Sequence, residues 1–214
     1  MNRRELLKLI AAATGGVMIG GEFFLSGCTN PDKGASMTFS DDDVAFLDEV
    51  AETILPKTGS AGAKEAGVGR YMTVYVNDCY DAEDQEIFHK GIKELDDACS
   101  KMHGHGFMKA TPEQRIALLK QVDKETKEYN TKRDKFNKDL KEKSKQGQEK
   151  TTGSEVQDKP MPNHYFQQMK QITIAGYFTS EKGRKEALRY TPVPGKWQGV
   201  VDYKKGEKSY AGLT

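Results

Sequence analysis

The sequence has almost no net charge. Its 33 basic and 32 acidic side chains give a formal charge of +1 at pH 7, and removal of the first 27 residues leaves the two signs equal. Proteins that bind nucleic acids through phosphate contacts need a surplus of positive charge. The composition therefore excludes a general nucleic-acid-binding role.

The sequence also lacks the short motifs that mark nucleotide, hydrolase and zinc-protease sites. It contains no Gly-x-Gly-x-x-Gly, P-loop, Gly-x-Ser-x-Gly or His-Glu-x-x-His pattern. These motifs position phosphates, nucleophiles or metals through particular backbone and side-chain geometry. Their absence argues against a nucleotide site in this chain, and its 214 residues leave room for one domain of ordinary size.

The N-terminus has no apolar run of the roughly 20 residues that span a bilayer, but it carries an export pattern. Arg3 and Arg4 precede an apolar run over 9–21, and a Leu-Ser-Gly-Cys sequence then ends at Cys28. The arginine pair resembles the twin-arginine export signal, and the residues that end at Cys28 resemble the lipobox of bacterial lipoproteins. We predict a signal peptide over 1–27 and lipidation of Cys28. An uncleaved anchor or a buried cysteine is the alternative.

These patterns also predict where the protein resides. Acyl chains on Cys28 hold a protein at a membrane without spanning it, because each buried CH₂ contributes about 0.8 kcal/mol. We therefore expect an exported protein, lipid-anchored in the bacterial cell envelope on the periplasmic side, at either the inner or the outer membrane. Residues 28–38 show no apolar periodicity, which predicts a flexible tether.

Residues 39–214 have the apolar spacing of about five helices. Ser40 precedes three carboxylates, which favours a helix that starts at Asp41 and stops before Pro56. Further helices are predicted over 64–80, over a segment that ends at Gly104, from Pro112 onward and over 163–178. No alternating run is long enough for a sheet. We predict an all-α fold, a single orthogonal or bundle-like helical domain with an irregular C-terminal tail rich in Pro, Gly and aromatic residues.

The fourth predicted helix runs into a charged insertion over about 123–159. Of its 37 residues, 20 are charged, and Phe136 and Leu140 are the large apolar residues in its middle. This composition is typical of a solvated helix with i,i+4 ion pairs or of a partly disordered insertion.

Candidate metal and disulfide residues are few. Cys99, His103 and His105 have spacing that suits a zinc or copper site, but no fourth ligand is evident, and a surface turn is the preferred interpretation of the two histidines. Because an exported protein lies in an oxidising compartment, Cys79 and Cys99 are candidates for a disulfide. Two buried free thiols are the alternative.

Several segments, in their order along the chain, resemble the gluconate 2-dehydrogenase subunit 3 family. They lie at 39–43, 54–56, 62–68, 106–114, 172–180 and 194–199. The resemblance implies a small, exported, all-helical accessory subunit with no catalytic, cofactor-binding or metal-binding residues of its own. Its expected partner is the large subunit, a flavin-dependent sugar or sugar-acid dehydrogenase that holds FAD and passes electrons to a cytochrome or quinone-linked acceptor. The small subunit is expected to escort, mature and anchor that partner.

The partner interface is predicted near the C-terminus, within the stretch that resembles the family. Aromatic residues on stiff loops are enriched at interfaces, which gives the following candidates: Tyr177, Phe178, Pro192, Pro194, Gly195 and Trp197. Packing of Trp197 onto the helical core is the alternative. The rival functions are a self-contained metal-binding lipoprotein that uses His103 and His105, and a carbohydrate-binding lipoprotein.

The export and anchoring hypothesis predicts separate effects at its two motifs. Joint replacement of Arg3 and Arg4 by lysine should trap the precursor in the cytoplasm, and Cys28→Ala should abolish metabolic labelling with palmitate. Cell fractionation and lipid labelling measure the two effects. Palmitate on the Cys28→Ala protein would contradict the predicted anchor.

Overall fold

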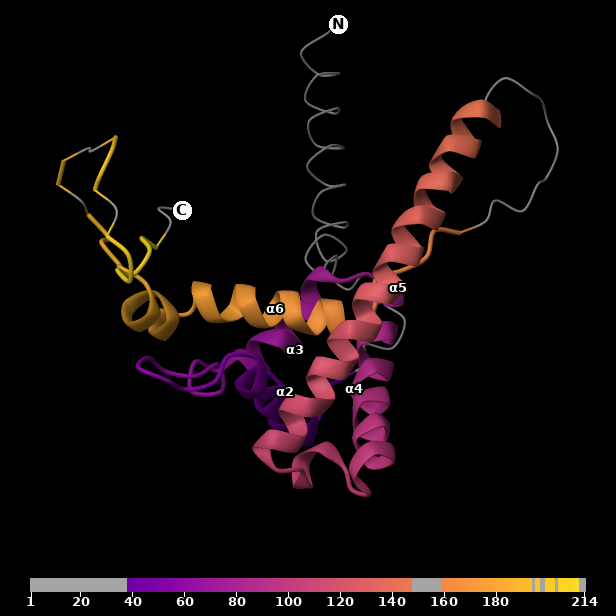
Figure 1. The fold of residues 1–214 in the computed structure, drawn as a ribbon, viewed down its shortest axis with the longest axis horizontal. Coiled ribbons are helices and arrows are strands. Elements are labelled where there is room, and N and C mark those ends of the chain that lie inside the picture. Colours follow the sequence, from indigo (N-terminus) through magenta and orange to yellow (C-terminus); the bar gives the residue numbers. More distant parts are fainter. Residues whose placement is uncertain (1–37, 148–158, 194, 197–198, 203, 212–214) are drawn as a thin grey trace, which may run out of the picture. The chain divides into compact units, whose positions relative to one another are not determined.

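A computed structural model describes residues 38–147, 159–193, 195–196, 199–202 and 204–211 (Figure 1). The predicted signal peptide, Cys28 and nearly all of the tether lie outside these residues. Five α-helices make up most of the described chain, and they are α2 (Asp41–Ile54), α3 (Val68–Cys79), α4 (Ala82–His103), α5 (Pro112–Gly147) and α6 (Tyr165–Thr179). A 3-10 helix, η1 (Phe107–Lys109), follows α4, and a π-helical turn, η2 (Gly183–Ala187), follows α6. The predicted all-α class is confirmed.

Two helices begin where the sequence predicts, at reciprocal side-chain caps. At the start of α2, Ser40 Oγ accepts from the backbone N–H of Asp43, and the Asp43 carboxylate accepts from the backbone N–H of Ser40. At the start of α5, Thr111 and Gln114 exchange the same pair of bonds. Each cap satisfies two backbone donors that have no partner within the helix.

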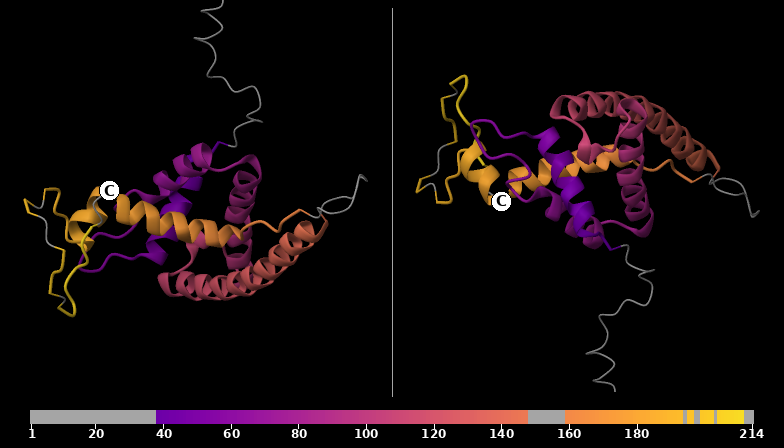
Figure 2. Two further views of the ribbon diagram at one scale, coloured as in Figure 1. Left: turned by 90° about the horizontal axis from the view of Figure 1, so that it is seen from above. Right: turned by 90° about the horizontal axis from the view of Figure 1, so that it is seen from below.

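Helix α6 lies at the centre of the domain, where it crosses α2 and α3 (Figures 1 and 2). It contacts α2, α3, α4 and α5. Its inward face is almost entirely buried and includes Phe166, Met169 and Ile172. Full burial of a side chain of this size contributes about 1.5 to 3 kcal/mol, so α6 supplies a large share of the core.

Two glycines allow α6 to pack closely against its neighbours. A Cβ atom at Gly176 of α6 would lie 2.6 Å from the ring of Tyr71 on α3. On α4, a Cβ atom at Gly91 would overlap the side chain of Tyr165. Only glycine therefore fits at these two positions, because any Cβ atom would collide with a tyrosine side chain.

Helix α5 is longer than the apolar pattern predicts. The pattern fades near Tyr129, but the helix continues to Gly147 and so contains the first part of the charged insertion. Side chains of α5 form hydrogen bonds with residues 161–163, which lead from the end of the charged insertion to α6. Tyr129 and Arg133 bond to Pro162 and Asn163, and the amide of Asn137 both accepts from and donates to the backbone of Met161, at 2.8 and 3.0 Å. Within the described residues, no helix is long and apolar enough to span a bilayer.

The Asn137 bonds make a stability prediction. Asn137→Ala removes both bonds to Met161 and should lower the free energy of unfolding by about 1 to 2 kcal/mol. Lys138→Ala, at the next and exposed position of the same helix, should change it by less than about 0.5 kcal/mol. Urea denaturation of both variants measures the difference. Equal stability of the two variants would show that the returning chain is not held by Asn137.

Candidate partner-binding surface

Tyr177 is a buried anchor, which corrects its prediction as an interface residue. Only 4% of it is exposed. Its hydroxyl donates to the carbonyl of Ala61 at 2.7 Å and lies 3.2 Å from Ser60 Oγ. The last turn of α6 packs on the loop over 55–67, so this ring points inward and is not available to a partner.

The backbone of the loop residue Ala61 forms hydrogen bonds with side chains of two elements. Its carbonyl accepts from Tyr177 of α6, and its N–H donates to Glu186 of η2 at 2.7 Å. The turn between α6 and η2 is equally tight. Ser180 Oγ donates to the Tyr177 carbonyl, and a Cβ atom at Gly183 would overlap that same carbonyl. The C-terminal end of α6 is therefore fixed in position.

An exposed apolar edge lies on the outward side of α6. Phe178 is 38% exposed, and its ring packs edge-on against Tyr177 with ring centres 5.1 Å apart. Ile174, one turn earlier, is 43% exposed. We call these two residues the α6 apolar edge. The exposure of Phe178 is compatible with partner binding, and its role there stays a prediction.

The described residues of 189–211 form an irregular segment after η2, which we call the C-terminal arm (Figure 1). Val193 and Val200 are 81% and 91% exposed, and Tyr190 and Val201 are exposed as well. Apolar side chains that gather on a surface often mark interaction sites. The arm therefore carries most of the strongly exposed apolar side chains of the described chain.

Arg189 closes the arm at its base. Its N–H donates to the carbonyl of Ser209 at 2.8 Å, and its carbonyl accepts from Ala211 at 3.0 Å. Its guanidinium donates to Glu207 and to the hydroxyl of Tyr210, and it also stacks over the Tyr210 ring at 4.7 Å. These bonds form the Arg189–Tyr210 bridge, the sole β-type pairing in the described chain. The two ends of the arm are thus held together.

The other predicted interface residues lie within the arm. Pro192 is exposed, and Gly195 is exposed with φ at +72°, in the left-handed region that favours glycine. Pro194 and Trp197 lie outside the described residues. The sequence prediction missed Ile174 and Val200, although the four-residue spacing of Ile174 and Phe178 on one helix was a usable signal.

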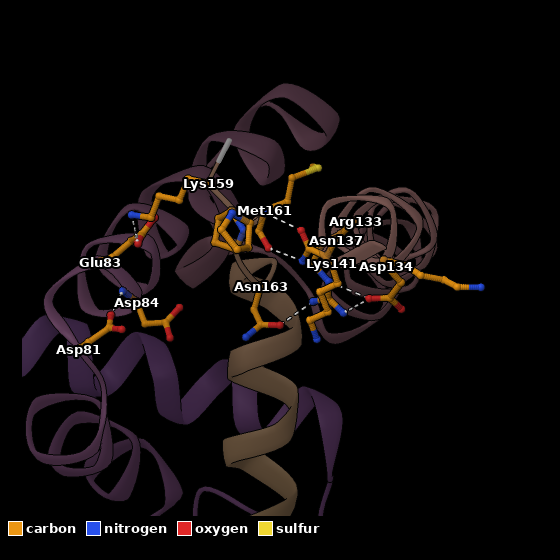
Figure 3. Close-up of a pocket in the computed structure, with 13 residues that line it drawn as sticks. Asp81, Glu83, Asp84, Arg133, Asp134, Asn137, Lys141, Lys159, Met161 and Asn163 are labelled. Atoms are coloured by element: carbon orange, nitrogen blue, oxygen red, sulfur yellow. Dashed lines mark hydrogen bonds and ion pairs between the residues drawn. The ribbon is translucent and has the colours of Figure 1, made fainter. Parts of the chain in front are cut away.

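A charged cleft lies elsewhere on the domain (Figure 3). It has a volume of about 630 Å³ and lies between the start of α4, the second half of α5 and residues 159–163. Three acidic side chains come from the N-cap and first turn of α4, and they are Asp81, Glu83 and Asp84; a fourth, Asp134, comes from α5. Basic side chains come mainly from α5, and they are Arg133, Lys138 and Lys141. This cleft could not be predicted from the sequence because residues far apart in the chain form it.

The acidic side of the cleft is partly neutralised. Lys159 forms an ion pair with Glu83 across it, and Asp84 accepts a hydrogen bond from Gln168 at 2.8 Å. Burial raises the pKa of Asp84, and the nearby charges of Asp81 and Glu83 raise it further. Opposite charges on the two sides leave the cleft without the single-sign field that attracts a simple ion.

The predicted disulfide between Cys79 and Cys99 is wrong. Both are free thiols; Cys99 is buried and Cys79 is exposed. Cys79 lies just before α4 begins, whereas Cys99 lies about 25 Å along that helix at its rise of about 1.5 Å per residue. A disulfide needs a Cα separation of roughly 5.5 Å. Burial raises the pKa of the Cys99 thiol.

His103 and His105 lie at the turn that follows α4. Gly104 between them has φ at +79° and ends the helix. The two rings are nearly parallel, with centres 6.3 Å apart. Within the described ranges, no group of three His, Cys, Asp or Glu side chains is arranged to hold a metal ion.

Comparison with known proteins identifies a family match. The model of a protein family described as gluconate 2-dehydrogenase subunit 3 matches residues 41–195, well over half of the chain. This range contains all five described helices and the first residues of the C-terminal arm. No curated protein and no solved structure matches the chain.

The Tyr177 anchor makes a prediction about stability. Tyr177→Phe keeps the buried ring but leaves the Ala61 carbonyl without its donor, so the free energy of unfolding should fall by about 1 to 2 kcal/mol. Tyr190→Phe removes the hydroxyl of an exposed tyrosine and should change it by less than about 0.5 kcal/mol. Thermal and urea denaturation measure both values. If Tyr177→Phe is as stable as the wild type, the hydroxyl does not hold the loop.

Proposed function

The chain belongs to the gluconate 2-dehydrogenase subunit 3 family, and from this membership we propose that it is the non-catalytic small subunit of a flavin-dependent sugar or sugar-acid dehydrogenase. The family match over 41–195 carries the proposal. In this proposal the large subunit holds FAD and performs the oxidation. The small subunit escorts and matures it and anchors it at the cell envelope.

The α6 apolar edge and the C-terminal arm form the proposed docking surface for the large subunit. Aromatic and aliphatic side chains on preorganised elements bind well because little conformational entropy is lost when they dock. The ring of Phe178 packs edge-on against the buried ring of Tyr177, and the Arg189–Tyr210 bridge joins the two ends of the arm. Both lie at the end of α6 that Ala61 and Gly183 fix in position.

The anchoring part of the proposal rests on the sequence of the N-terminus. If Cys28 is lipidated, the twelve residues 28–39 connect the lipid to Ser40, the N-cap of α2. Such a segment reaches at most about 40 Å when fully extended. An anchor of that length would keep the bound large subunit close to the membrane, where a cytochrome or quinone-linked acceptor can take its electrons. Arg3 and Arg4 would provide the export route for the folded complex.

Phe178 provides the direct test of the docking surface. Phe178→Ala should weaken binding of the purified large subunit by about 2 kcal/mol, which is roughly thirtyfold in the dissociation constant. Titration calorimetry or surface plasmon resonance with the flavin-loaded large subunit measures the change. The thermal unfolding transition of the variant shows whether the fold is retained.

Met108→Ala is the matched control for this experiment. Met108 is 46% exposed, so it resembles Phe178 in apolar exposure, but it lies on η1. Its replacement should leave binding unchanged. The proposed docking surface would be wrong if Phe178→Ala binds the large subunit as tightly as the wild type does. It would also be wrong if Phe178→Ala and Met108→Ala lose the same amount of affinity.

A further inference from the structure

We propose that residues 199–202 of the C-terminal arm bind the large subunit by adding a strand to an exposed sheet edge of that partner. This inference rests on the proposed function, because it specifies how the docking surface makes its contact. It concerns the part of the arm around Val200 and Val201.

The backbone of this segment has unused hydrogen-bonding groups. At the base of the arm, Arg189, Ser209 and Ala211 are paired through their backbones. By contrast, residues 190–193 and 199–202 make no backbone hydrogen bond to any other residue in the described part of the chain. They also lie outside the described helices and turns, apart from bends at 192 and 199. These backbone groups therefore have no backbone partner within the described part of the chain.

The side chains of the segment favour a strand. Val200 is 91% exposed and Val201 is 48% exposed. Valine is enriched in strands because its branched side chain packs well on a pleated surface. The described part of the domain has no sheet in which these residues can take part, since its sole β-type pairing is the bridge between Arg189 and Tyr210.

Burial of these valines in an interface selects the kind of partner. When Val200 and Val201 are covered, the amides between and around them lose water as well. A buried backbone group without a hydrogen-bond partner costs about 1 to 3 kcal/mol. A partner helix supplies no backbone partners, because its own backbone groups are paired within the helix. An edge strand presents a row of free N–H and C=O groups and can pair those along one edge of the added strand.

The position of the segment also suits strand addition. The arm begins directly after η2, whose Glu186 binds Ala61 beside the Tyr177 anchor. The Arg189–Tyr210 bridge closes the arm at its base, and the valines lie in the part that the bridge leaves unpaired. Strand addition here would continue the docking surface that begins at Phe178.

Proline substitution separates a backbone contact from a side-chain contact. Val201→Pro removes the N–H that a partner strand would bind, and it should weaken binding of the flavin-loaded large subunit at least tenfold. Val201→Ala keeps that N–H and should weaken binding clearly less than Val201→Pro does. Lys205→Pro is the matched control in the same arm. The backbone N–H of Glu207 donates to the Lys204 carbonyl and Gly206 has φ at +90°, which puts Lys205 at a turn position that accepts proline. This control should bind like the wild type.

Amide hydrogen exchange of the full chain, free and in complex, is the second measurement. The amides of Gly199 and Val201, which lie on the same edge of the added strand, should exchange at least tenfold more slowly in the complex. If the wild type binds but these amides are not slowed, or if Val201→Ala and Val201→Pro weaken binding equally, the strand pairing is wrong while the docking proposal stands. If the wild-type chain does not bind the large subunit at all, the proposed function itself fails.

Discussion

The burial of helix α6 is the interaction on which the rest of the domain depends. Its inward face packs against four other helices, and Gly91 and Gly176 permit the close approach that this packing requires. The same helix carries Tyr177, whose hydroxyl reaches the loop at Ala61. Because α6 is fixed along one face and at its C-terminal end, the residues on its outward side are presented in a defined position. The core-facing side of α6 and the α6 apolar edge are therefore two faces of one helix.

The most exposed apolar side chains of the described chain lie at its C-terminal end, where exposed charged side chains lie among them. The end of α6 and the C-terminal arm expose Phe178, Val193 and Val200, whereas the cleft between α4 and α5 is lined mostly by charged side chains. Burial of charges in an interface carries a large desolvation cost unless each is paired, but burial of apolar surface is favourable. This contrast favours the C-terminal end as the site of a stable subunit contact. The charged helix α5 and its cleft are better suited to remain in water.

The sequence predicted the features that depend on neighbouring residues and missed those that depend on distant ones. The caps at Ser40 and Thr111 were predictable because each is closed within three residues. For the charged insertion the sequence predicted either a solvated helix or a partly disordered segment, and it could not decide between them because Asn137 and its neighbours bind a returning chain that periodicity does not reveal. Tyr177 was assigned to the surface because helical phase cannot show that Ala61, over a hundred residues away, lies beneath it. The candidate site was predicted in part, through the exposed Phe178, and the closure of the arm by Arg189 carried no sequence signal.

We propose that this chain binds a separate flavoprotein and has no oxidation chemistry of its own. The experiment that checks this proposal is purification of the complete lipidated chain from its native membrane, followed by separation of the subunits. We expect a flavin-containing sugar or sugar-acid dehydrogenase to copurify in roughly equal amounts, and the flavin and the dehydrogenase activity to stay with that large subunit after separation. Purification of the chain without a flavoprotein, or dehydrogenase activity in the isolated chain, would contradict the account.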